Sequence, residues 1–428
     1  MRINVELRSP VSRLALIIIF SCGAAAYLGF SAARFIISVI TDPGARVDTS
    51  IIEATANYFP NSARAQARMA SHLIESGVDL TINHERTAER AVYYAARAVK
   101  LAPHNYEFRI LLAAAKELAG DLTEAETELQ AALKLAPHLV TVHWRLANLL
   151  LREEKLARAI SEFRLVNEAD TELLIPTIHL LWQASEGNIE PLNAVVGSDP
   201  RSQLTLALFL VQQGQFEPAV KIADGIERQS ILNHPESGKL LDSLISSGQI
   251  ELASKLWRDF FGANEQPLIW NESFETPIRD NFTQFDWNIG QNKYAKIGIT
   301  AVNARTGWRS LIISYLGIDT TTLNSEIHQL VKVRPGARYT LKCYVKAEKL
   351  VTPDGPQIVV TTQDSTTTIA ASAALGPGSY DWQLLTMDFV APLNTRALII
   401  AIKQTPKFSY VDPTQGTVWF DDFVLTEQ

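Results

Sequence analysis

Cysteine is nearly absent from this 428-residue chain, which contains only Cys22 and Cys343. Cys22 lies inside a long apolar run, whereas Cys343 lies in a region patterned like β-strands, so we expect no disulfide between them. One cysteine in each region leaves the redox compartment of the protein open.

A surplus of basic residues is also missing. The formal net charge at pH 7 is -7, and the isoelectric point is about 5.7. Proteins that bind nucleic acid present a positively charged stripe to the phosphates, and this sequence has no such stripe. We therefore predict no nucleic-acid partner.

The short motifs of common catalytic sites do not occur either. The sequence has no glycine-rich phosphate loop, no GxSxG, no HExxH pattern and no dinucleotide fingerprint. The paired carboxylates that cleave glycosides come from distant positions, so spacing alone does not test for them. We predict a non-enzymatic protein without catalytic residues.

The N-terminus contains one long run without charge. Leu14–Ala33 spans 20 uncharged residues, and about 20 helical residues are enough to cross a bilayer core of roughly 30 Å. Arg2, Arg8 and Arg13 precede the run, so the positive-inside rule places the N-terminus in the cytoplasm. This predicts a cytoplasmic tail at 1–13 and a single-pass anchor at 14–40 in a bacterial inner membrane, with the bulk of the chain in the periplasm.

Two other readings of this run stay open. Ala24-Ala25-Ala26 could form the cleavage site of a signal peptide, but the apolar run continues well past it, which favours an uncleaved anchor. Cys22 could carry a lipid, although Phe20 stands where a lipoprotein signal has a small residue.

From 50 to 262 the apolar residues recur at helical spacing, in paired segments. Ala102-Pro103-His104 and Ala136-Pro137-His138 mark the same place in two units that lie 34 residues apart. The intervening unit has small residues where two helices would cross, and a glycine where they would turn. This pattern resembles the tetratricopeptide repeat. The resemblance implies an all-α solenoid whose groove binds a partner protein.

From 266 to 428 the pattern changes to strands separated by proline- and glycine-rich turns. Within Tyr339–Ala347 every second residue is apolar, so one face is buried and the other is solvated, as in a sandwich. Seven strands are predicted: Ser310–Tyr315, Glu326–Val333, Tyr339–Ala347, Gln357–Thr362, Trp382–Phe389, Ala397–Ile402 and Thr417–Leu425. This region is expected to fold on its own.

The ends of the strand region resemble a known family. It opens with Asn271-Glu272-Ser273-Phe274-Glu275 and closes with Trp419-Phe420-Asp421-Asp422-Phe423. Together with Val333-Arg334-Pro335-Gly336 these segments look like a carbohydrate-binding module of the galactose-binding-like jelly roll, close to families 4 and 9. The resemblance implies a jelly-roll sandwich, which serves in sugar binding or as a plain structural module.

The same resemblance suggests site residues. Members of the family commonly hold a structural Ca²⁺, and Glu275 and Asp422 match the positions that supply its carboxylates, with Asp421 as a lesser contributor. Trp287, Trp382 and Trp419 match core positions of the family. For sugar binding we therefore select three other residues: Trp308 in a loop, Tyr344 on a solvated face, and Gln404 as a polar neighbour.

The sequence thus predicts a multidomain protein with an N-terminal transmembrane helix, an all-α TPR-like solenoid and a C-terminal all-β jelly-roll sandwich. We expect a membrane-anchored envelope scaffold that binds a partner protein and a glycan, in exopolysaccharide or surface-polysaccharide assembly. Two alternatives remain: a structural adaptor whose jelly roll binds no sugar, and an accessory subunit of a glycan-processing enzyme.

Overall fold

The computed structural model describes residues 10–40, 47–77, 84–263, 267–406 and 413–428. The chain divides into two compact units, Met1–Val195 and Val196–Gln428. The helices end at Phe261, close to the predicted change from helix to strand, but the second unit begins well before that point. The last helices therefore belong to the same compact unit as the β-sandwich.

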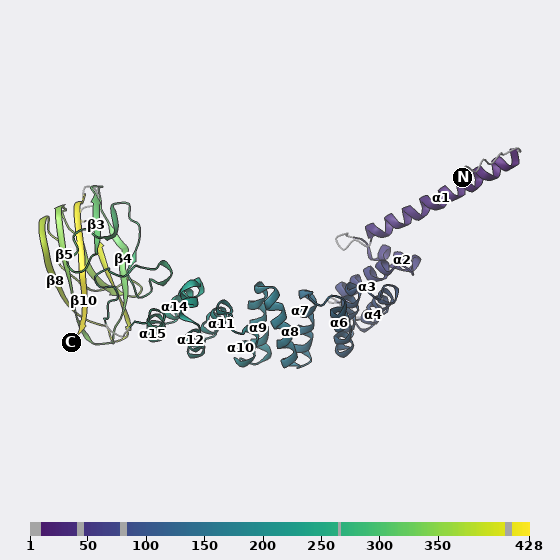
Figure 1. The fold of residues 1–428 in the computed structure, drawn as a ribbon, viewed down its shortest axis with the longest axis horizontal. Helices are drawn as coiled ribbons and strands as arrows, with labels where there is room; N and C mark the ends of the chain where they lie inside the picture. Colours follow the sequence, from purple (N-terminus) through teal and green to yellow (C-terminus); the bar gives the residue numbers. More distant parts are fainter. Residues whose placement is uncertain (1–9, 41–46, 78–83, 264–266, 407–412) are drawn as a thin grey trace. The chain divides into compact units, whose positions relative to one another are not determined.

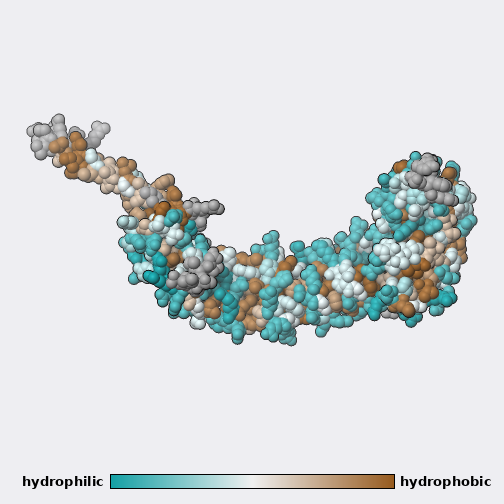
Figure 2. All heavy atoms as spheres, turned by 180° about the vertical axis from the view of Figure 1, so that it is seen from behind, coloured by the Kyte–Doolittle hydropathy of each residue, from teal (hydrophilic) through white to brown (hydrophobic). Residues whose placement is uncertain are grey.

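The first helix, α1, runs from Pro10 to Ile40, and its described side chains are exposed or partly exposed. Within the described residues it is the one helix that is long and apolar enough to cross a membrane, over Ile17–Ile40. Figure 2 shows the hydrophobic colouring along this helix.

The remaining helices of the first unit pack in sequence-adjacent pairs. The starts of α5 and α7, Tyr106 and Val140, lie 34 residues apart, as do those of α6 and α8, Leu122 and Leu156. This confirms the predicted period. The helices are α2 (Thr49–Tyr58), α3 (Ala63–Gly77), α4 (His84–Leu101), α5 (Tyr106–Leu118), α6 (Leu122–Leu135), α7 (Val140–Arg152), α8 (Leu156–Ala169), η1 (Thr171–Leu173), α9 (Leu174–Ala184) and α10 (Glu190–Val196).

Small residues allow the paired helices to approach closely. Ala113 of α5 and Ala125 of α6 are fully buried, and Ala147 and Ala159 repeat this in the next pair. Gly120 turns the chain between α5 and α6 with a φ of 84°, a conformation that side chains with a Cβ rarely adopt.

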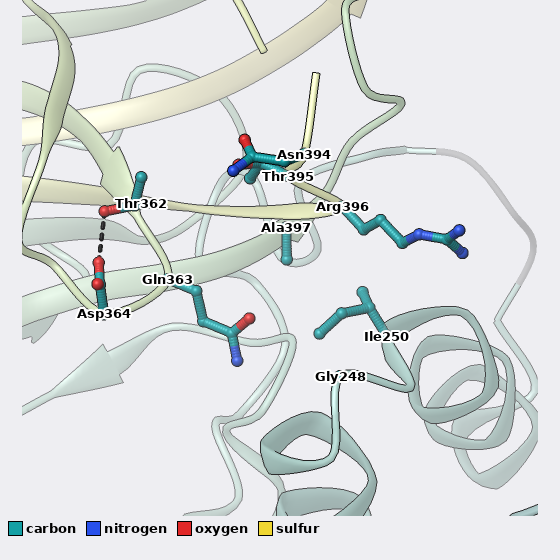
Figure 3. Close-up of a pocket in the computed structure, with 9 residues that line it drawn as sticks. All are labelled: Gly248, Ile250, Thr362, Gln363, Asp364, Asn394, Thr395, Arg396 and Ala397. Atoms are coloured by element: carbon teal, nitrogen blue, oxygen red, sulfur yellow. Dashed lines mark hydrogen bonds between the residues drawn. The ribbon is translucent and has the colours of Figure 1, made fainter. Parts of the chain in front are cut away.

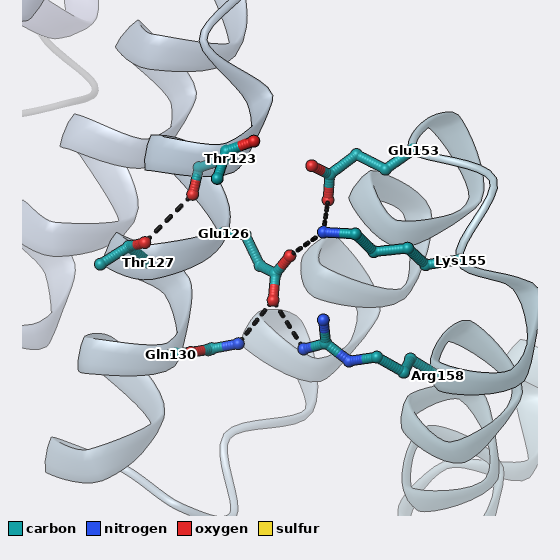
Figure 4. Close-up of polar contacts among 7 residues, drawn as sticks. All are labelled: Thr123, Glu126, Thr127, Gln130, Glu153, Lys155 and Arg158. Atoms are coloured by element: carbon teal, nitrogen blue, oxygen red, sulfur yellow. Dashed lines mark hydrogen bonds and ion pairs between the residues drawn. The ribbon is translucent and has the colours of Figure 1, made fainter.

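A polar cluster joins two neighbouring pairs (Figure 4). The largely buried Glu126 of α6 receives the ammonium of Lys155 and the guanidinium of Arg158, each at 2.6 Å, and the amide of Gln130 at 2.6 Å. Lys155 also pairs with Glu153 at 3.1 Å. Burial opposes ionisation of Glu126, but the hydrogen bonds from Arg158 and Lys155 outweigh it and lower the pKa of this carboxyl.

Among the described residues of the second unit, five α-helices and one 3-10 helix precede the strands: α11 (Pro200–Gln212), α12 (Phe216–Asp224), α13 (Arg228–Asn233), α14 (Pro235–Ser246), α15 (Ile250–Phe261) and η2 (Asp280–Phe282). The last α-helix packs against the chain that enters the sandwich. Trp257 of α15 contacts Trp270 and Phe285, with ring centroids 5.2 and 6.1 Å apart. Gly238 of α14 has no side chain because a Cβ there would lie 2.3 Å from the carbonyl oxygen of Asn281.

The strands form two antiparallel five-stranded sheets, which is the predicted all-β architecture (Figure 1). The first sheet has the order β1-β4-β9-β6-β7 and the second β2-β3-β10-β5-β8. Their bounds are β1 (Asn288–Ile289), β2 (Ala295–Thr300), β3 (Ser310–Leu316), β4 (Leu323–Lys332), β5 (Arg338–Val351), β6 (Gln357–Thr362), β7 (Thr368–Ala371), β8 (Gly378–Val390), β9 (Ala397–Gln404) and β10 (Gln415–Glu427).

The three tryptophans assigned to core positions do not share one environment. Trp287 is fully buried in the cluster between the sheets, as expected. Trp419 is also buried, but it alternates along β10 with Val418 and Phe420, which face that cluster, so it lies on the opposite face of the sheet. Trp382 is only partly buried and lies outside the cluster.

Candidate functional site

The most exposed tryptophan of the described sandwich lies in the loop 301–309, between β2 and β3. Trp308 is 82% exposed, although a large aromatic side chain normally gains from burial. We call this segment the Trp308 loop. Gly307 precedes the tryptophan with a φ of 62°, and a Cβ there would lie 2.3 Å from Oε1 of Glu275. Only glycine fits this close approach.

The backbone beneath Trp308 is held by a carboxylate. Oε1 of Glu275 accepts hydrogen bonds from the N–H of Trp308 at 2.6 Å and from the N–H of Arg309 at 2.8 Å. Hydrogen bonds to a charged acceptor are stronger than those between neutral groups. The indole is therefore exposed on a fixed backbone.

Two further carboxylates hold the same loop from β10. Oδ2 of Asp421 accepts from the N–H of Arg305 at 2.7 Å and from that of Thr306 at 3.4 Å. Asp422 receives the guanidinium of Arg305 and the hydroxyls of Thr306 and Ser273. The structure thus brings Glu275, Asp421 and Asp422 together around the Trp308 loop, at the joined ends of the sandwich.

Burial changes the ionisation of this cluster. Burial raises the pKa of Asp421 to about 6. The hydrogen bond from the N–H of Arg305 favours the ionised carboxylate and opposes this rise. The neighbouring charge of Asp422 adds to the rise. Burial, followed by the charge of Asp422, also raises the pKa of Glu272. The cluster therefore holds closely spaced carboxyl groups that benefit from a cation.

Arg305 supplies that positive charge in the structure. Its guanidinium pairs with Asp422 and lies over the ring of Tyr344, 3.4 Å from the ring centroid. A cation over an aromatic face is attracted by the ring quadrupole. The face of Tyr344 that we selected for stacking on a sugar is thus covered by Arg305.

The expectation for Gln404 is wrong in its geometry. Gln404 is only 3% exposed and lies on β9 of the first sheet, whereas Tyr344 lies on β5 of the second sheet. Its amide donates to Thr414 Oγ1 at 2.7 Å and to the carbonyl oxygen of Asp354 at 3.0 Å. Gln404 closes a buried polar network and is no surface neighbour of Trp308 or Tyr344.

The oxygen atoms around Asp422 are candidate ligands for Ca²⁺, which prefers six to eight oxygen ligands. Glu275 and Asp422 flank one loop and could contribute oxygens, as the resemblance implies. Among the residues that the structure describes, however, no three acidic, histidine or cysteine side chains form a group that could hold a metal ion. In this arrangement the Asp422 carboxylate is already paired with Arg305 and hydroxyl donors.

A cleft that sequence reasoning missed lies elsewhere in the second unit (Figure 3). It has a volume of about 590 Å³ and is bounded by the turn before α15, the turn after β6 and the loop before β9. Polar or charged side chains belong to six of its nine lining residues: Gly248, Ile250, Thr362, Gln363, Asp364, Asn394, Thr395, Arg396 and Ala397. Figure 3 shows the side chains of Gln363 and Ile250 pointing into the space between the helices and the sheet. Amide, guanidinium and carboxylate groups together suit a polar ligand.

Solved structures similar to each part of the chain are known. A family 4 carbohydrate-binding module is 20% identical, covering 37% of this chain and 99% of that one, with a TM-score of 0.29. A family 61 carbohydrate-binding module in complex with β-1,4-galactotriose is 16% identical, with a TM-score of 0.27. The match covers 38% of this chain and 100% of the module. A thermophilic tetratricopeptide-repeat protein of Thermus thermophilus is 17% identical, with a TM-score of 0.29. The match covers 31% of this chain and 71% of that protein.

Sequence comparisons add no family to these likenesses. No protein-family model matches the chain, and no curated protein sequence matches it. The similar solved structures include both carbohydrate-binding modules and a tetratricopeptide-repeat protein.

Proposed function

We propose that the protein is a membrane-anchored scaffold of a bacterial envelope, in which the helical pairs bind a partner protein and the sandwich binds a polysaccharide. Assembly of an exopolysaccharide or surface polysaccharide would use these three parts together. The proposal includes no catalytic step.

The main support for the proposed glycan binding is the exposed indole of Trp308, whose backbone is held in place. Its side chain is 82% exposed, while Glu275 holds its backbone N–H at 2.6 Å. Sugar rings have apolar faces that stack on aromatic side chains, and a preorganised binding group loses less entropy when it binds. Trp308 therefore offers a stacking surface.

The loop that carries this indole also carries polar groups that suit sugar hydroxyls. Arg305 and Thr306 belong to the same loop, and Arg309 follows Trp308 directly. The ring of Tyr344 lies against the guanidinium of Arg305 and holds this arginine in place. In this proposal Tyr344 positions Arg305, while Trp308 makes the stacking contact.

A binding experiment tests this role. The chain would be applied to an array of bacterial and plant polysaccharides, followed by affinity measurement with the best ligand. Trp308→Ala should weaken binding by about five- to thirtyfold, because a buried aromatic contact contributes about 1–2 kcal/mol. Leu393→Ala removes a similarly exposed apolar side chain from another loop, 85% exposed, and should leave binding unchanged.

A structural adaptor is the second candidate, and the contact between α15 and the sandwich favours it. Aromatic rings of Trp257, Trp270 and Phe285 join the helices to the β-part, as in a permanent internal interface. An adaptor would bind no glycan in the array. Equal binding by the native chain and Trp308→Ala would instead exclude this loop as the site.

A further inference from the structure

The short helix α2 is apolar on two opposite sides. Ile52 and Ala56 are buried in a core cluster with residues of α3 and α4. On the outer side Ile51, Ala54 and Tyr58 follow one another at spacings of three and four residues, which places them on one stripe. Ile51 is 47% and Tyr58 is 82% exposed.

The outer side of α2 is hollowed. An open depression of about 540 Å³ is lined by Ser50, Ile51, Ala54, Thr55, Tyr58 and Phe59. Two of the hydroxyls near this depression already donate hydrogen bonds. The hydroxyl of Thr55 donates to the carbonyl oxygen of Ile51 at 2.7 Å, and that of Ser50 donates to Asp48 at 2.6 Å.

The charge that flanks this side is also neutralised. Glu53 forms an ion pair with Arg90 of α4 at 2.6 Å. The stripe of Ile51, Ala54 and Tyr58 is itself uncharged. Such a surface can leave water without exposing an unpaired charge to an apolar environment.

The position of α2 in the chain indicates what covers the stripe. Only eight residues separate the end of α1 at Ile40 from the start of α2 at Thr49, and the two helices contact each other. Eight residues reach at most about 29 Å even when fully extended. If α1 crosses a bilayer, α2 is thereby confined to the vicinity of the bilayer surface.

We infer that the outer stripe of α2 lies on the membrane surface, with Ile51 and Ala54 against the acyl chains and Tyr58 at the level of the headgroups. This inference rests on the proposed membrane anchoring of α1. Tyrosine suits the boundary because its ring is apolar and its hydroxyl is polar. Contact with lipid along α2 would fix the orientation of the first helical pairs relative to the bilayer.

Fluorescence quenching in vesicles of phosphatidylcholine tests the inference with the full chain. Native Cys22, which is exposed on α1, takes an environment-sensitive dye, whereas Cys343 is buried in the sandwich. The second sample is Tyr58→Cys and the third Leu165→Cys, both combined with Cys22→Ala. Leu165 on α8 is 47% exposed and serves as the matched control. The vesicles contain lipid with a nitroxide quencher either near the headgroup or near the chain end.

We expect the dye at position 58 to lose fluorescence with the shallow quencher, and the dye at position 165 to keep it. The dye on Cys22 should be quenched within the bilayer. Quenching at Cys22 without greater quenching at 58 than at 165 would overturn the membrane contact of α2. Absence of quenching at Cys22 would instead refute the anchor. A cross-linked dimer formed through position 58 in vesicles, with the dye there unquenched, would assign the stripe to a second copy.

Discussion

The indole N–H of Trp257, in the last helix, donates a 3.0 Å hydrogen bond to the carbonyl oxygen of Phe282, in the segment that leads into the sandwich. Both side chains are buried. A buried indole that lost this acceptor would leave a polar group without a partner, at a cost of about 1–3 kcal/mol. The helix and the sandwich therefore contribute to one core.

The first prediction concerns where the second unit can be cut. A fragment of residues 196–428 should be soluble and melt cooperatively, whereas 267–428 should bind a hydrophobic dye and melt at a lower temperature. The reason is that removal of α15 uncovers Phe282 and Phe285, which the intact unit buries. Equal melting temperatures for the two fragments, measured by calorimetry, would show that the sandwich is independent, as the strand pattern alone suggests.

The second prediction is that the stability of the folded state depends on pH through the ionisation of Asp286. Burial raises the pKa of this carboxyl to about 6. Hydrogen bonds from the N–H of Trp287 and the amide of Asn271 lower the pKa, but burial outweighs them. Its ordinary value in an unfolded chain is about 3.9. Between these two values the folded state holds more protons than the unfolded state, so stability falls as the pH rises from about 4 to 6.

Asp286→Asn isolates this effect because asparagine does not titrate. The free energy of unfolding of the variant relative to the native 196–428 fragment should rise by about 1–3 kcal/mol from pH 4 to pH 6, since one pKa unit corresponds to about 1.4 kcal/mol. Urea denaturation at a series of pH values measures this difference. Parallel curves for the two proteins would show that the pKa of Asp286 is the same in the folded and the unfolded state.

The third prediction tests the Ca²⁺ that the family resemblance implies at the Trp308 loop, where the ion would have to displace Arg305 from Asp422. An ion that binds only the folded state stabilises it by about 2.7 kcal/mol at a hundredfold excess over Kd, or by a few degrees in Tm. Asp422→Ala should abolish this shift between excess chelator and excess calcium.

Arg305→Gln sharpens the calcium test. If the guanidinium competes with the ion, this variant should gain a larger calcium-dependent rise in Tm than the native chain, because Asp422 loses its paired cation. An unchanged Tm in chelator and in calcium for both proteins would leave Arg305 as the cation of this site and refute the metal.

The fourth prediction concerns topology. A reporter enzyme that is active only in the periplasm, fused after Gln428, should be active because basic residues precede the apolar run of α1. Replacing Arg2, Arg8 and Arg13 with glutamine should reduce this activity by weakening the orientation signal. Activity from a reporter that works only in the cytoplasm would contradict the proposed envelope location.

The strands that could be predicted from sequence are those with enough residues to show alternation. Seven predicted strands overlap β3–β6 and β8–β10. The three others were missed because β1 has two residues, β7 has four, and β2 carries Gly298 in its middle. Pairing with a neighbouring strand defines such short segments, and the local sequence does not show that pairing.

The candidate site was predicted only as far as local chemistry allows. Glu275, Asp422 and Trp308 meet at one loop. The family resemblance indicated the two carboxylates, and the place of Trp308 in a loop before a strand indicated the tryptophan. The stacking of Arg305 on Tyr344 depends on how a loop folds over a distant strand, and the sequence carries no pattern for it. The same holds for Gln404, because a glutamine near a strand end can face either side.

The cluster around Glu126 has a mechanical consequence. One carboxylate of α6 holds two cations from the segment that begins α8, so a twist between these neighbouring helical pairs must stretch two ion pairs at once. The pairs α5–α6 and α7–α8 should therefore turn as one stiff segment when a bound partner pulls on the array, and transmit the load to their neighbours. Because the two cations are partly exposed to solvent, this torsional stiffness should soften as salt concentration rises.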